Sequence, residues 1–115
     1  MNWYIHITKI AKQDMINAAD YIEFTLLNPD AADSLLDTAE AGINSLSQMP
    51  DRFRPVDDPL LSSWGVRFIM VKNYLAFYVI SEESKTVHII RFLYGKRNWL
   101  LFSVLHSMIL CFHPY

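Results

Sequence analysis

Apolar and polar positions follow two different periods in the first part of the chain. Residues 2–8 alternate between strongly apolar and more polar side chains, which is typical of a half-buried strand. From about Lys9 to about Leu27 the apolar residues recur every three or four positions, which predicts an amphipathic helix. The apolar stripe of this helix consists of Ala11, Met15, Ala18, Ile22 and Leu26.

A sharp break follows at Asn28-Pro29-Asp30. Asn28 suits the N-cap of a new helix, and Pro29 suits its first turn, where the missing N–H costs nothing. A second apolar stripe then continues to about Gln48. Because the link between the two helices is so short, the pattern predicts an antiparallel helix hairpin.

Three strand-like runs occupy the second half of the chain. A proline-rich loop precedes them, and they cover residues 64–72, 74–81 and 86–94. The turns between them are short enough for hairpins. The sequence therefore predicts an α+β domain, in which an N-terminal strand is followed by an antiparallel helix hairpin packed on a small antiparallel β-sheet.

The last residues form a distinct apolar segment. Residues 99–112 place their apolar side chains at helical spacing, and the run is short for a membrane span. We expect one folded domain over residues 1–98 and a helical C-terminal extension over residues 99–115. The extension is expected to pack against the domain or to join two copies of the chain in a homodimer.

Composition agrees with one folded domain. The chain has 115 residues, of which 52% are hydrophobic and 19% charged, enough for a single core. Cys111 has no second cysteine to pair with, and no signal peptide is visible at the start, so we expect a cytoplasmic protein. No association with a membrane is expected.

The net charge of −2 hides a strong asymmetry. Residues 1–51 contain eight acidic side chains and two lysines, which gives −6, and residues 52–115 contain eight bases and four acids, which gives +4. The chain is too balanced for its whole surface to bind nucleic acid. Positive charge is concentrated where the predicted sheet lies.

Several kinds of chemistry find little support. The four histidines are scattered, and the three glycines form no phosphate-binding loop, so neither a metal site nor a cofactor is expected. No nucleophile-elbow pattern supports a serine hydrolase.

The arginines are the remaining candidates, because each offers a planar fork of donors to phosphate or carboxylate. Alternation places Arg67 and Arg91 opposite their neighbours in the strands, so both could lie on the sheet face away from the helices. There they would be near Arg52 and Arg54. Three tyrosines would surround this positive surface: Tyr74, Tyr78 and Tyr94. The alternative is that these arginines are ordinary strand residues paired with Glu82, Glu83 or acids of the helices.

The order of motifs resembles the RelE/ParE superfamily of toxins over about residues 3–99. The matching pattern is NP-x-AA, P-x-x-x-RP, G-x-R, NYL-x-FY and V-x-I-x-R-x-L-x-G-x-R-x-W. The resemblance implies the toxin of a type II toxin–antitoxin module, held inactive by a cognate antitoxin whose C-terminal segment wraps around it. It also implies a helix hairpin against a small sheet, as the periodicity predicts.

The resemblance leaves two targets open. ParE-like members inhibit DNA gyrase and are not enzymes, and the R-x-L-x-G-x-R ending is closer to them. RelE-like members enter the ribosome and cleave mRNA without a metal. Residues expected to bind the target or the antitoxin are Arg52, Arg54, Arg67, Tyr74, Tyr78, Arg91 and Trp99.

In the ribonuclease alternative, the resemblance implies that cations bind the scissile phosphate and that Tyr94 stands where relatives often have histidine. The candidate catalytic residues are then Arg67, Arg97, Lys96 and Tyr94. Members of the superfamily usually end soon after the R-x-W motif, whereas this chain continues with the apolar extension. A third alternative is therefore a non-toxic domain that serves oligomerisation.

Overall fold

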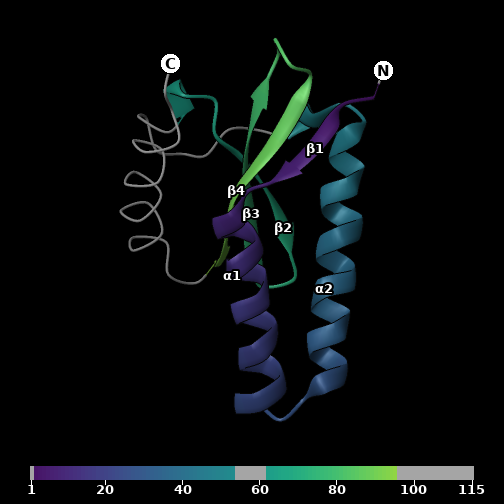
Figure 1. Ribbon diagram of the computed structural model, residues 1–115, viewed down its shortest axis with the longest axis vertical. Helices are drawn as coiled ribbons and strands as arrows, with labels where there is room; N and C mark the ends of the chain where they lie inside the picture. The colour runs from purple at the N-terminus through teal and green to yellow at the C-terminus, as the bar shows by residue number, and fades with distance from the viewer. Residues whose placement is uncertain (1, 54–61, 96–115) are drawn as a thin grey trace.

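The computed structural model describes residues 2–53 and 62–95. Two helices lie side by side against one four-stranded sheet, and the short link between them turns the chain back (Figure 1). This confirms the predicted α+β class and the antiparallel helix hairpin. In chain order the helices and strands are β1 (Tyr4–Ile7), α1 (Lys9–Asp20), α2 (Pro29–Asn44), β2 (Arg67–Val71), β3 (Tyr74–Ser81) and β4 (Thr86–Tyr94).

The sheet is mixed, with strand order β1-β4-β3-β2. Strands β2, β3 and β4 form the predicted antiparallel meander. The N-terminal strand β1, whose partner the pattern did not indicate, pairs in parallel with β4 from Tyr4 opposite Thr86 to Ile7 opposite Ile89. A parallel pair needs a long crossover connection, and the helix hairpin with the first two meander strands supplies it.

Both helices begin where the sequence indicates. The side chain of Thr8 accepts a hydrogen bond from the Ala11 N–H at 3.1 Å and caps α1. The side chain of Asn28 caps α2 in the same way, with Pro29 at the first helical position. A π-helical turn, Tyr21–Thr25, continues α1, and a short 3₁₀ turn, Ser45–Ser47, follows α2.

The main core lies between the helix hairpin and the sheet. Small residues on α1 and α2 let the helices approach the strands closely. At Gly42 an added Cβ would lie 3.3 Å from Cδ1 of Ile69, so α2 packs closely against β2 at this position. The main core includes Ala11, Ala18, Leu35, Ala39, Ile43, Leu46, Ile69, Val71, Ala76, Tyr78, Val87, Ile89 and Phe92.

A second apolar cluster occupies the other face of the sheet. Val66, Phe77 and Ile90 are fully buried there, and Trp64 and Phe68 pack beside them. The predicted extension and its boundary at residues 98 and 99 lie outside the described residues, so they stay predictions. Within residues 2–53 and 62–95, no helix has the length and apolar character needed to cross a bilayer.

Candidate functional site

Arg67 begins β2 opposite Tyr78 and faces the helix side of the sheet. The predicted alternation with Val66 and Phe68 is confirmed, because both of these belong to the cluster on the other face. The predicted face was wrong, since the helices cover the side to which Arg67 points. The sequence alternation alone could not say which face the helices would cover.

The guanidinium of Arg67 is engaged with the segment that follows α2. It donates to the backbone carbonyl of Phe53, and a longer bond of 3.4 Å reaches the carbonyl of Asp51. The predicted closeness of Arg67 to the loop that carries Arg52 is therefore confirmed. These contacts give Arg67 a structural task, because it holds the loop against the first residue of β2.

Tyr78 does not line an open surface, so that expectation was wrong. It is fully buried in the main core, and its hydroxyl donates to the Pro50 carbonyl at 2.6 Å. A buried tyrosine normally needs such a partner for its hydroxyl. Tyr78 and Arg67 therefore hold the same loop from two neighbouring strands.

Arg91 is paired with an acid of α1. Its Nε and one terminal nitrogen donate to the two carboxylate oxygens of Asp14 at 2.7 and 3.0 Å. The two side chains are only 14% and 12% exposed. The expectation that Arg91 would lie on an open positive surface was wrong, and the alternative of a pair with a helix acid is the one observed.

A β-bulge explains why alternation failed at Arg91. Tyr78 pairs with Ile89 while Phe77 pairs with Arg91, so Ile90 is an extra residue in β4. Ile90 consequently joins the second apolar cluster, whereas Phe92 joins the main core. These two neighbours of Arg91 therefore face opposite sides of the sheet.

An aromatic cluster marks the end of the sheet where β3 begins and β4 ends. Tyr74 stacks on Phe92 with ring centroids 5.1 Å apart, and the ring of Tyr94 meets Tyr74 edge-on at 5.4 Å. Burial raises the pKa of Tyr74, and its neighbours Tyr94 and Tyr21 raise it further. Tyr94 is 38% exposed, so this cluster reaches the surface.

The structure brings together only part of the expected site. Tyr74 meets Tyr94, and Arg67 meets the loop of Arg52, but the pairing of Arg91 with Asp14 removes it from the set. The backbone of Arg52 lies in a short 3₁₀ turn, Pro50–Arg52, and its side chain is outside the description. The remaining predicted site residues, Arg54, Lys96, Arg97 and Trp99, also lie outside the described residues.

A groove beside the edge strand β2 was not foreseen. It has a volume of about 410 Å³ and opens between α2 and β2. Met70 is 70% exposed there. An exposed methionine on a strand is a weak signal in a sequence, because exposed apolar residues are common. The groove is lined by Gly42, Ser45, Phe53, Phe68, Ile69 and Met70.

Within residues 2–53 and 62–95, no group of three His, Cys, Asp or Glu side chains is placed to hold a metal ion. One pair of histidines, His6 and His88, does come into contact, at 2.9 Å between their Nδ1 atoms. The sequence did not indicate this pair, because the partner of the first strand was not predictable from local pattern.

Comparison with known proteins identifies the family. The sequence model described as the ParE toxin of the type II toxin–antitoxin system parDE matches residues 5–99. No curated protein sequence matches the chain.

Solved structures with the same fold include two from toxin–antitoxin systems. The first is from the chromosomal ParDE toxin–antitoxin system of P. aeruginosa, with 20% identity, a TM-score of 0.66, and coverage of 80% of this chain and 95% of the other. The second is from the toxin–antitoxin complex RelBE2 of Mycobacterium tuberculosis, with 22% identity, a TM-score of 0.55, and coverage of 82% and 92%. With the family match over residues 5–99, this chain belongs to the ParE toxin family of type II toxin–antitoxin systems.

Proposed function

We propose that the chain inhibits growth by binding and poisoning DNA gyrase, without catalysing a reaction itself. The observation that carries this proposal is the match to the ParE toxin family over residues 5–99, which includes the R-x-L-x-G-x-R ending. Gyrase inhibition is the activity that the resemblance attributes to ParE-like members.

The contacts of the arginines support a binding role over cleavage of mRNA. A ribonuclease needs cations that are free to meet the charge developing on the scissile phosphate. The guanidinium of Arg67 donates to backbone carbonyls, and that of Arg91 is held by Asp14. Arg67 is the one candidate catalytic cation within the described residues, and it is used within the fold, as is the candidate binding residue Arg91.

Tyr74, which contacts the candidate catalytic residue Tyr94, offers little help to an acid–base mechanism. A general base works best with a pKa near the operating pH, so a tyrosine would need a strongly lowered pKa. Burial moves the pKa of Tyr74 in the opposite direction, so its phenol stays protonated at neutral pH. This favours a role for Tyr74 in packing or in contact with a partner.

The second part of the proposal is a cognate antitoxin as partner. The two solved neighbours come from a ParDE system and a RelBE2 complex. On this chain we assign the antitoxin contact to the groove beside β2, where Met70 presents an exposed apolar side chain. The arginine face expected from the sequence is less suited, because Arg67 and Arg91 are already paired inside the fold.

The decisive experiment expresses the chain without an antitoxin and follows growth, and tests the purified chain in two assays. One assay measures DNA supercoiling by purified gyrase, and the other measures mRNA cleavage in a translating extract. We expect arrested growth and inhibited supercoiling with intact mRNA. Cleaved mRNA with unaffected gyrase would instead identify a RelE-like ribonuclease, and no effect in any assay would identify a non-toxic domain.

The antitoxin contact has its own test. We expect Met70→Asp to weaken neutralisation by the co-expressed antitoxin, because the new charge would be buried in an apolar contact. Ile16→Asp is the matched control, since Ile16 is also an exposed apolar residue but lies on α1. Equal neutralisation of the Met70→Asp toxin and the control would overturn the assignment of the groove.

A further inference from the structure

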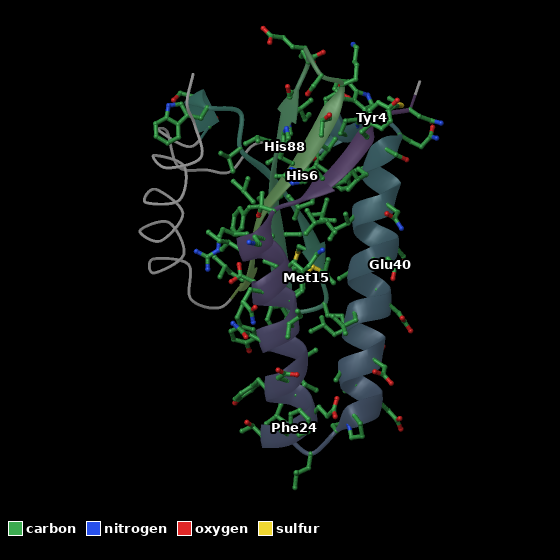
Figure 2. The ribbon with its side chains drawn as sticks, in the orientation of Figure 1. Tyr4, His6, Met15, Phe24, Glu40 and His88 are labelled. Carbon is green, nitrogen blue, oxygen red and sulfur yellow. The ribbon has the colours of Figure 1, made fainter. Side chains whose placement is uncertain are left out.

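Two histidines from opposite ends of the domain meet on neighbouring strands. His6 of β1 and His88 of β4 are partners in the parallel register. Their Nδ1 atoms are 2.9 Å apart, and the rings meet edge-on with centroids 5.1 Å apart and planes at 89°. Figure 2 shows the two side chains together over β1 and β4.

Their surroundings leave the pair accessible to solvent. Both lie at the strand positions between core residues, such as Ile5 and Val87, and so on the face away from the main core. His6 is exposed and His88 is half-buried. A neutral imidazole is the form that binds metal ions.

We propose that His6 and His88 form a two-nitrogen site for a divalent transition metal of the Ni²⁺ or Cu²⁺ class. Metal–nitrogen bonds to histidine are about 2.0–2.1 Å long, so two nitrogens at a right angle around one ion lie roughly 2.9 Å apart. The observed separation has this value. A tetrahedral ion such as Zn²⁺ would need a wider separation, whereas octahedral or tetragonal ions accept it.

A metal ion would replace the hydrogen that the two Nδ1 atoms now share. At 2.9 Å one Nδ1 donates its hydrogen to the other, so the two atoms face each other. Binding a metal requires both rings to carry their hydrogen on Nε2 and to turn so that their lone pairs converge on one ion. Among residues 2–53 and 62–95 no third His, Cys, Asp or Glu side chain joins them, so this part of the chain supplies two ligands to the ion.

The metal would connect two strands that are distant in the chain. His6 and His88 are 82 positions apart, and β1 pairs with β4 over only four residues. The folded protein presents both nitrogens together, and the unfolded chain does not, so a bound ion stabilises the fold. The metal thus acts as a clamp on the N-terminal strand. This site does not depend on the proposed action on gyrase.

The test is titration of the full chain, without a polyhistidine tag, with Ni²⁺ alone at neutral pH in a calorimeter. We expect one ion per chain and a melting temperature that rises with Ni²⁺ concentration. His6→Ala and His88→Ala should each weaken binding by roughly tenfold or more, because each removes the gain from a second, linked ligand. Neither variant should show the rise in melting temperature.

The control carries His106→Ala and His113→Ala together and keeps both sheet histidines; it should bind as the parent chain does. His6 is exposed, so circular dichroism should show that His6→Ala keeps its fold, and this variant decides the result. Unchanged Ni²⁺ affinity in His6→Ala would overturn the site. If only the control lost Ni²⁺ binding, the metal site would not be the His6–His88 pair. Zn²⁺ binding as tight as Ni²⁺ binding would overturn the choice of metal.

Discussion

The carboxylate of Asp14 on α1 holds both the side chain of Arg91 and the backbone of the next residue in β4. Two bonds come from the guanidinium, and the N–H of Phe92 donates a third at 3.1 Å. The bulge at Ile90 turns Arg91 into the position where this is possible. One acidic side chain thus joins the first helix to the irregular point of the last strand.

Asp14→Asn should lower the free energy of unfolding by about 3 kcal/mol, because it leaves the guanidinium of Arg91 largely buried without a counter-charge. Denaturant unfolding followed by circular dichroism measures this. The double variant Asp14→Leu/Arg91→Met should recover much of the loss, since apolar residues of similar size can replace a buried ion pair. A single variant as stable as the parent chain would show that the pair contributes nothing.

Arg67→Ala should destabilise the fold by about 1–3 kcal/mol, because the carbonyls of Phe53 and Asp51 lose their donor. The matched control is Lys72→Ala, whose exposed ammonium donates to Ser34 at 2.7 Å and should cost much less. Thermal and denaturant unfolding of both variants compare them. If Arg67→Ala abolished toxicity while leaving stability unchanged, the residue would instead contact the target.

Tyr78→Phe tests the conclusion that Tyr78 serves the core. Removing its hydroxyl leaves the Pro50 carbonyl without that donor and should cost about 1–2 kcal/mol. Tyr4→Phe, at an exposed position of β1, should leave the unfolding free energy unchanged. If Tyr78→Phe were as stable as the parent chain but bound the antitoxin or the target more weakly, Tyr78 would serve binding and not the core.

Gly95→Ala should destabilise the end of β4 by about 1–3 kcal/mol, as overpacking does. The Gly95 N–H donates to the Asn73 carbonyl at 2.8 Å, and an added Cβ would lie 3.2 Å from the same oxygen. Gly42→Ala is a milder change, since its Cβ would meet the end of the Ile69 side chain and alanine favours the helix. Equal melting temperatures for the two variants would show that the close approach of Gly95 to the Asn73 carbonyl does not require a glycine.

Stability should fall on acidification through the titration of His88. Its pKa in the folded protein is lowered, chiefly by burial and then by His6, below the usual value of about 6.5. The unfolded chain therefore takes up the proton more readily, so the contribution is complete above about pH 6.5 and is lost as pH falls through the folded pKa. Urea unfolding from pH 8 to pH 5 measures this slope.

The control for the pH dependence is His88→Gln, which should show a flatter slope over the same range. His6→Gln should flatten the slope only in part, because burial of His88 remains. An unchanged slope in His88→Gln would assign the pH dependence to other groups.

Much of the architecture was predictable from local pattern. Asn28 and Pro29 mark the start of α2, and the bounds of β3 and β4 agree with the predicted runs of residues 74–81 and 86–94. These features depend on neighbours in the chain: side-chain spacing, a capping oxygen and a missing N–H. The order of motifs also indicated the superfamily, which the family match over residues 5–99 confirms.

The tertiary structure alone decided what the candidate residues do. Local alternation showed that Arg67 opposes Val66 and Phe68, but not that the helices would cover its side of the sheet. A bulge reversed the alternation at Arg91, and its partner Asp14 is 77 positions away. The contact of His6 with His88 likewise required β1 to pair with β4. Periodicity reports on consecutive residues, whereas faces, bulges and partners depend on contacts between segments far apart in the chain.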